Sequence, residues 1–278
     1  MKYRLLALGQ AAILLALIVV AMFKGAWIPE GTLNRLVQAG KLLAAVGCLS
    51  AALSFERSDY LRRAWGLQAL NMFLLLRDLP LAFLPKGTLV EVLNQSIVVV
   101  ANLAALGANW MMARAWRVAR LEPPGSAWRR RAIIGAALAL ALGVAGIPLA
   151  HSMLAWLKGA PPPPRPVIYL VSGLSDTLCI CLIAPVALTV LAMRGGLLVW
   201  PWGFYMGAMI CWLFYDASDI ARQLPAFRGL GYELELASES LRVLACGFTF
   251  WAALAQRFVV TGVQDASRRR RGLPGARV

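Results

Sequence analysis

Ionisable side chains interrupt several of the long apolar stretches in this chain of 278 residues, and these are the side chains that could do chemistry. Lys41 lies eight residues into the apolar stretch 33–55, and Asp176 lies nine residues into the stretch 167–193. A charge at the centre of a membrane helix costs about 2.5–3.5 kcal/mol, so such residues usually face a cavity and pair with one another. We therefore expect a ligand-binding or proton-binding site, whose candidate residues are Lys41, Arg77, Asp78, Glu91, Asp176, Asp216 and Asp219.

These residue types indicate binding rather than catalysis. The sequence contains no Gly-x-Ser-x-Gly motif, no His-Glu-x-x-His motif and no phosphate-binding Gly-x-x-x-x-Gly-Lys motif. Ser172, Ser175 and Asp176 are close together, but no histidine or lysine that could act as a base lies within one helical turn. The chain has one histidine, and its five cysteines all lie in apolar stretches without Cys-x-x-Cys spacing. We therefore predict no catalytic residues, no metal and no cofactor, and we expect that the protein is not an enzyme.

A purely structural role stays open for each candidate residue. Lys41 and Asp176, the two deepest candidates, could form ion pairs that only fix the packing of the helices. The candidates near helix ends could reach interfacial water with no ligand involved, and these are Arg77, Asp78, Glu91 and Asp219.

The composition places these stretches in a membrane. Hydrophobic residues make up 60% of the chain and charged residues only 15%, whereas soluble domains carry about 25% charged residues. Apolar stretches of nineteen residues or more can cross the hydrocarbon core, and they must do so as helices. We predict an all-α, polytopic membrane protein with eight transmembrane helices, at residues 5–23, 33–55, 64–84, 89–113, 132–157, 167–193, 197–220 and 234–260.

The distribution of Lys and Arg predicts the orientation in the membrane. Eighteen of these residues fall on the side that carries both termini, against six on the other side. Positive charges concentrate in cytoplasmic loops, so we expect both termini in the cytoplasm and a bacterial-type inner membrane. Because the net charge of +15 comes largely from these loops, the expected partner is the lipid bilayer and not nucleic acid. The candidate residues then lie toward the non-cytoplasmic side, in a polar vestibule above an apolar floor.

A weak internal repeat suggests two parallel halves. Trp65-Gly66 and Trp202-Gly203 are 137 residues apart, and each pair lies in the third predicted helix of its half. An even number of helices in each half places the pseudo-twofold axis along the membrane normal. The predicted organisation is a first four-helix half (1–120), a basic cytoplasmic linker (121–131), a second four-helix half (132–263) and a basic cytoplasmic tail (264–278).

Three features resemble the multi-span N-terminal sensor regions of bacterial diguanylate cyclases and histidine kinases. Arg62-Arg63-Ala-Trp65 leads through an apolar stretch to Asp78, and Trp202-Gly203 leads likewise to Asp216. The helix that follows each aspartate begins with an acidic residue, Glu91 or Glu235. The resemblance implies a sensing function, and because no cyclase or kinase domain follows, the output would need a separate partner.

We therefore expect an integral inner-membrane binding or sensing module whose polar vestibule opens to the periplasmic side. It would relay ligand binding to a separate cytoplasmic or membrane signalling partner. The alternative is a transporter of ions or small solutes built from two four-helix repeats. An enzyme that acts on lipids fits least, since the sequence offers no pair of nucleophile and base.

Overall fold

The protein is all-helical in the part of the chain that this computed structural model describes. Those residues are 8, 9, 11, 12, 14, 15, 31–81, 83–85, 87–118, 127–143, 150, 153, 154, 156–159, 166–192, 197–222 and 225–270. Most of the predicted helix 5–23 and much of the second half of the predicted helix 132–157 lie outside them. Among the described residues there is no strand, so the predicted fold class is confirmed in this respect.

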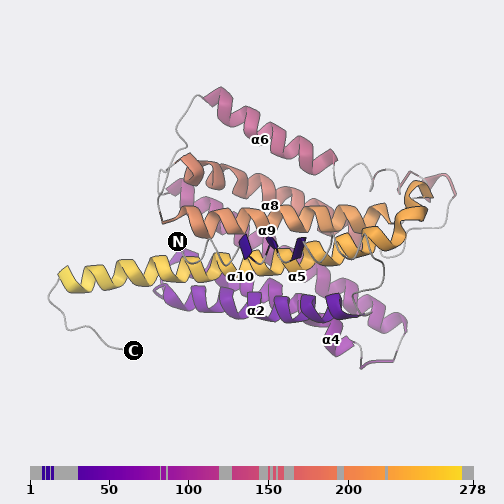
Figure 1. Cartoon of the computed structure of the whole chain (residues 1–278), viewed down its shortest axis with the longest axis horizontal. Coiled ribbons are helices and arrows are strands. Elements are labelled where there is room, and N and C mark those ends of the chain that lie inside the picture. The colour runs from indigo at the N-terminus through magenta and orange to yellow at the C-terminus, as the bar shows by residue number, and fades with distance from the viewer. Residues whose placement is uncertain are drawn as a thin grey trace.

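Figure 1 shows the arrangement of the helices, and their bounds follow the apolar stretches of the sequence closely. Five predicted helices are present with ends within a few residues of the expected positions, apart from extensions of α5 and α10. The elements are α2 (Thr32–Ser54), α3 (Tyr60–Leu74), η1 (Leu75–Arg77), α4 (Asp78–Leu81), α5 (Thr88–Val118), α6 (Ala127–Ala141), α8 (Pro166–Ala192), α9 (Val199–Ala221), η3 (Pro225–Leu230) and α10 (Gly231–Arg270).

Three of the described helices are long and apolar enough to cross a membrane. They are α2, the part Thr88–Arg117 of α5, and the part Gly231–Gln264 of α10. Large apolar side chains such as Leu42, Val46 and Leu53 are more than half exposed on the outer face of α2, as expected for a surface that contacts lipid. These helices fit a membrane protein, while eight spans and the orientation stay predictions.

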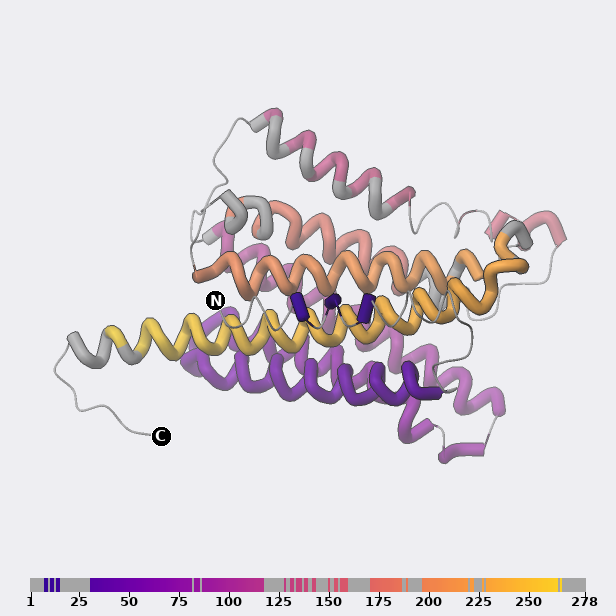
Figure 2. The backbone as a smooth tube through the Cα atoms, in the orientation of Figure 1, coloured from indigo at the N-terminus to yellow at the C-terminus, as the bar shows by residue number. Residues whose placement is uncertain are grey.

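Six helices pack side by side into a closed ring. In the order of contact they are α2, α3, α5, α8, α9 and α10, and α10 packs back against α2. Figure 2 shows their long axes running in roughly the same direction, with α6 lying outside the ring against α8. A closed ring leaves an interior to which every one of the six helices can contribute side chains.

The ring divides into two groups of three helices with equivalent contacts. The contact of α2 with α3 corresponds to that of α8 with α9, the contact of α3 with α5 to that of α9 with α10, and the contact of α5 with α8 to that of α10 with α2. The Tyr205 hydroxyl donates a hydrogen bond to Gln68 Oε1 at 3.2 Å, across the same 137 residues that separate Trp65 from Trp202. Gln68 and Tyr205 therefore occupy equivalent positions in the two parts of the repeat. Two equivalent residues can touch each other only where they lie next to the twofold axis. The two four-helix halves themselves stay a prediction.

The predicted continuous helix 64–84 differs from the structure, which breaks it. Here α3 ends at Leu74, the 3₁₀ turn η1 follows, and α4 continues in a short turn that contains Pro80. Proline has no N–H for the carbonyl four residues earlier and its ring clashes with that carbonyl, so the helix tightens before it. At this break, the Leu75 carbonyl oxygen accepts a hydrogen bond from Lys41 Nζ of α2 at 2.7 Å.

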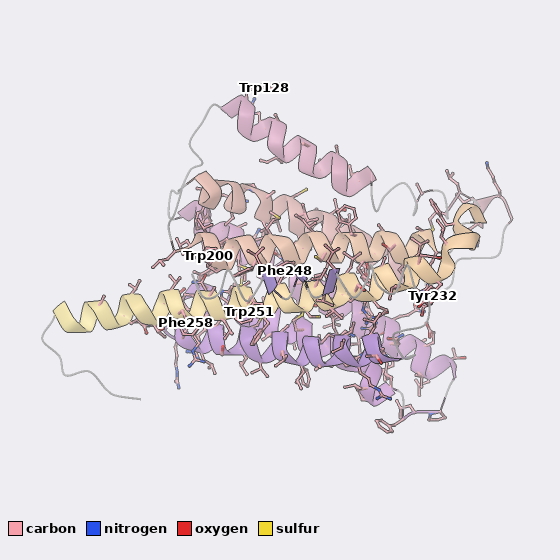
Figure 3. The ribbon with its side chains drawn as sticks, viewed as in Figure 1. Trp128, Trp200, Tyr232, Phe248, Trp251 and Phe258 are labelled. Atoms are coloured by element: carbon pink, nitrogen blue, oxygen red, sulfur yellow. The ribbon has the colours of Figure 1, made fainter. Side chains whose placement is uncertain are left out.

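Aromatic side chains mark both ends of the bundle. Trp128 and Trp200 lie near the end at which α6 and α9 begin, and Tyr232 lies near the opposite end (Figure 3). Trp128 is 76% exposed and Tyr232 is 53% exposed. Tryptophan and tyrosine residues near the two ends of a helical bundle are typical of the two membrane interfaces.

Glycine allows α2 and α10 to pack closely. A Cβ atom at Gly40 would lie 3.0 Å from Cys246 Cβ, and one at Gly47 would lie 2.8 Å from Phe250 Cδ2. Small residues at helix contacts let two backbones approach, which is a main source of helix association in lipid.

We predict that Gly40→Leu destabilises the protein by about 1–3 kcal/mol, the usual cost of overpacking a close contact. Gly66→Leu is the matched control, because a Cβ atom at Gly66 meets nothing within 4 Å. The measurement is equilibrium unfolding of both variants in mixed micelles. An equal loss of stability in the two variants would contradict the close packing of α2 on α10.

Candidate functional site

One pocket of about 110 Å³ lies inside the ring, toward the end of the bundle at which α4 is found. Every ring helix contributes to its wall, together with η1. The lining residues are Lys41, Asn71, Leu75, Arg77, Val98, Asn102, Ala105, Ser172, Asp176, Cys179, Met209, Trp212, Tyr215, Asp216, Asp219 and Arg242.

The charged residues of the wall separate by sign. The cations come from α2, η1 and α10, and the carboxyl groups come from α8 and α9. In the contact order of the ring, α10, α2 and α3 are neighbours, and α8 and α9 are neighbours. The pocket therefore has a basic side and an acidic side, and a ligand within it would meet both.

Lys41 is the most deeply buried charge on the basic side. Its side chain is 1% exposed, and Nζ donates to Asp78 Oδ2 at 2.9 Å and to the Leu75 carbonyl oxygen at 2.7 Å. A buried ammonium is stable only when it is paired and its protons have acceptors. The break between α3 and α4 supplies both acceptors, so Lys41 and the break depend on each other.

Asp78 joins the cations of three elements. Its Oδ2 atom lies 2.9 Å from Lys41 Nζ and 3.8 Å from Arg242 Nη2, and its Oδ1 atom lies 4.0 Å from Arg77 Nη2. Gln38 Nε2 donates a further hydrogen bond to Oδ2 at 3.3 Å. The Asp78 side chain is 40% exposed, so this cluster lies between the pocket and the outer surface.

Two further contacts position the arginines. Arg242 Nη1 donates to Glu239 Oε1 at 2.7 Å, and its guanidinium carbon lies 5.2 Å from the centre of the Tyr215 ring. Arg77 Nε donates to Asn94 Oδ1 at 2.6 Å, which connects η1 to α5. Each contact holds a cation at the rim of the pocket.

On the acidic side, Asp176 of α8 and Asp216 of α9 both line the pocket, and their carboxyl groups are close enough to interact. Two buried carboxyl groups in contact repel each other strongly when both are charged, so such a pair favours sharing one proton. Asp219, one turn further along α9, also lines the pocket. A proton shared by this pair would lie at a surface that faces the pocket.

The structure brings most of the predicted candidates together. Lys41, Arg77, Asp176, Asp216 and Asp219 line the pocket.

Two of the predicted candidates do not line the pocket. Asp78 is not a lining residue, and it binds the cations from behind the pocket wall. Glu91 Oε1 accepts a hydrogen bond from Gln95 of its own helix at 3.3 Å, also away from the lining. The ion-pair partner of Lys41 is Asp78 and not Asp176.

Several lining residues were not among the predicted candidates. Arg242 carried a signal, since it is a charge near the start of the apolar stretch 234–260. Asn71 carried another, because residues 71, 75 and 78 share one helix face. Isolated polar residues give weaker signals, because each could equally be lipid-facing or buried, and these are Asn102, Ser172, Trp212 and Tyr215.

The floor of the pocket is less apolar than predicted. Gln68 and Asn109 are fully buried, one or two turns along α3 and α5 from pocket residues, and Tyr205 hydrogen-bonds Gln68. Gln68 Nε2 and Asn109 Oδ1 are a buried donor and acceptor without a partner among the described residues. Beyond them Trp65 and Trp202 pack edge-on against Tyr205, at 5.8 Å and 6.4 Å between ring centres. Gln68, Asn109 and Tyr205 thus form an uncharged polar layer beneath the pocket. Below this layer, Trp65 and Trp202 form what we call the aromatic plug.

The cysteines do not point to metal or disulfide chemistry in the described part of the chain. All five are free thiols. No group of three or more His, Cys, Asp or Glu residues there could hold a metal ion.

Comparison with known proteins gives no relative. No protein-family model, no curated protein and no solved structure matches this chain.

We predict that Lys41 and Asp78 are energetically coupled by about 0.5–3 kcal/mol in a double-mutant cycle with Lys41→Met and Asp78→Asn. The matched control is Arg222 with Glu235, whose charged atoms are 3.6 Å apart while their side chains are 34% and 62% exposed. An exposed pair of this kind contributes about 0–1 kcal/mol. The measurement is unfolding in mixed micelles, and a coupling no larger than that of the control pair would show that the buried contact does not stabilise the fold.

Proposed function

We propose that the protein is a binding or sensing module of a bacterial-type inner membrane, with eight transmembrane helices and both termini in the cytoplasm. The ligand is a small polar solute that enters from the non-cytoplasmic side. Its binding shifts the ring helices, and the basic cytoplasmic segments pass the change to a separate partner.

The single observation that carries this proposal is the pocket inside the ring. A cluster of charges that only fixed helix packing would be expected to fill its own space. Here the Lys41–Asp78 pair and the Asp176–Asp216 pair belong to opposite sides of a cavity. Convergent polar groups in one well-formed cavity are the usual mark of a binding site.

The volume limits the size of the ligand. Pockets for drug-sized molecules measure about 300–1,000 Å³, and an engineered cavity of about 150 Å³ in another protein holds one benzene molecule. A cavity of about 110 Å³ therefore suits a solute with only a few heavy atoms.

The helix α10 offers a direct route for a relay. It is continuous from Gly231 to Arg270, it contributes Arg242 to the pocket, and it packs against both α9 and α2. From Arg242 to Arg270 it extends about 40 Å at the usual rise per residue. A small shift at the pocket would therefore move the basic end of the helix.

A specific observation keeps the transporter as the second candidate. Gln68, Asn109 and Tyr205 continue the polar surface beneath the pocket, where the sequence predicted only apolar packing. The aromatic plug below them would have to open for a solute to pass. A flux assay in proteoliposomes, with any solute found to bind, separates the two functions.

We predict that a small polar solute raises the melting temperature of the purified wild-type protein but not that of Asp176→Asn. A ligand at 100 times its Kd stabilises a protein by about 2.7 kcal/mol, which is readily measured. The screen uses small neutral, anionic, cationic and zwitterionic solutes in detergent or nanodiscs. Glu91→Gln is the matched control, since Glu91 lies outside the pocket lining, and it should respond as the wild type does.

The contrary result is that no charge class of solute shifts the wild type while Asp176→Asn is itself strongly destabilised. The charges would then be structural, and the proposed binding function would be wrong.

A further inference from the structure

The Asp176–Asp216 pair has a feature that helix packing alone does not explain. Both carboxyl groups lie in the wall of the cavity, so a proton that they share would lie where a solute could replace it. Lys41 forms its ion pair with Asp78, and Arg242 forms ion pairs with Asp78 and Glu239. Among the described residues, no cationic side chain forms a salt bridge with Asp176 or Asp216, so the pair is an acidic surface open to a cationic ligand.

We propose that the pocket binds its solute through an ammonium group that takes the place of the proton shared by Asp176 and Asp216, so that binding releases one proton. This inference rests on the proposed binding function and names the chemical class of its ligand. A primary ammonium has three N–H donors, enough to reach both carboxylates and one further acceptor.

The exchange balances in atoms and charge. Before binding, the pair carries one proton and one negative charge. The solute brings one positive charge, both aspartates become carboxylates that accept N–H bonds, and the displaced proton leaves to solvent. No other bond is made or broken.

A second observation supports a ligand at this place. Asn71 lines the same pocket and is 6% exposed. The indole Nε1 of Trp212, another lining residue, is buried with no partner among the described residues. Buried polar groups are normally satisfied, so unpaired ones that face a cavity indicate an absent partner. The side-chain carbonyl of Asn71, in the same pocket wall, is a candidate acceptor for the third N–H bond.

The basic side of the pocket selects among amines. Lys41 pairs with the carboxylate of Asp78 at 2.9 Å, whereas Arg242 contacts both Asp78, at 3.8 Å, and Glu239, at 2.7 Å. An acidic group on the solute would give Lys41 a second anion. A small zwitterion, with an ammonium group and a carboxylate, therefore fits the pocket better than a simple amine.

Other groups around the pair shape its dependence on pH. The titratable or charged residues that face it are Lys41 from α2, Arg77 from η1, Cys179 from α8, Tyr215 and Asp219 from α9, and Arg242 from α10. The lining residues of α3 and α5 include the amides Asn71 and Asn102. At pH values where the pair holds its proton, the solute can bind only by releasing that proton. The affinity for the solute then falls about tenfold for each unit by which the pH is lowered.

The experiment measures proton release on binding by the purified full chain. The probes are glycine as the zwitterion, ethylammonium as the cation, acetate as the anion and propionamide as the neutral solute. A pH indicator in weakly buffered solution counts protons, and thermal stabilisation reports binding between about pH 5.5 and 7.5, where the amines stay charged. Asp176→Asn and Asp216→Asn each remove the pair, and Glu91→Gln is the control.

We expect glycine to bind more tightly than ethylammonium, each with release of about one proton per molecule bound. Asp176→Asn should weaken binding at least tenfold and abolish proton release, while Glu91→Gln should change neither. If a variant does not fold, proton release by the wild type still decides the matter.

Three results overturn the inference, and they separate it from the proposed function. If acetate or propionamide binds and the amines do not, the binding site stands and the ammonium assignment is wrong. If the amines bind without proton release, the exchange at Asp176 and Asp216 is wrong. If none of the four probe classes binds, the proposed binding function fails together with the inference.

Discussion

The rest of the structure depends on the contacts of one buried ammonium. Lys41 Nζ donates to the Leu75 carbonyl oxygen at 2.7 Å and to Asp78 Oδ2 at 2.9 Å, with a side chain that is 1% exposed. These contacts tie α2 to the point where α3 ends and η1 begins. The Leu75 carbonyl lies at the helix break, and Asp78 begins the short helix that follows it, so both acceptors of Lys41 come from this break. The break between α3 and α4 thus stabilises the buried charge of Lys41.

From that contact the charges of the site follow in order. Asp78 also attracts Arg242 and Arg77, so one carboxylate collects the cations of α2, η1 and α10 on one side of the ring. The carboxyl groups of Asp176 on α8 and Asp216 on α9 remain on the other side. Separation of opposite charges in a low-dielectric interior is costly, and a bound solute or ordered water between them would reduce that cost.

Much of the fold could be predicted from the sequence, because long apolar stretches have few alternatives to helix in a membrane. The predicted stretches 33–55 and 197–220 became α2, Thr32–Ser54, and α9, Val199–Ala221. The break at Leu75 was missed although Pro80 marks it, since apolar composition alone does not show where a helix ends. The partner of Lys41 could not be predicted either. It depends on how α2 and α3 lie against each other, and single-sequence periodicity carries no information on that arrangement.

The candidate site was predictable to the extent that charge in an apolar stretch is rare. Five of the seven candidate residues line one pocket, whereas Asp78 binds behind it and Glu91 lies elsewhere. Uncharged residues such as Asn71 and Asn109 were missed because amides occur on many helix faces. The polar layer beneath the pocket is therefore a property of the three-dimensional arrangement, and it bears on whether the ring can conduct a solute.

The most direct test is the accessibility of Cys179, the cysteine that lines the pocket. Single-cysteine variants that keep Cys179, Cys48 or Cys246 are treated with a small, cationic, membrane-impermeant methanethiosulfonate, in intact spheroplasts and in inverted vesicles. Cys48 and Cys246 are also buried but are not pocket-lining residues, which makes them matched controls. A pocket that opens to the non-cytoplasmic side predicts modification of Cys179 alone, and only in spheroplasts. Absence of modification, or modification only from the cytoplasmic side, would contradict the account.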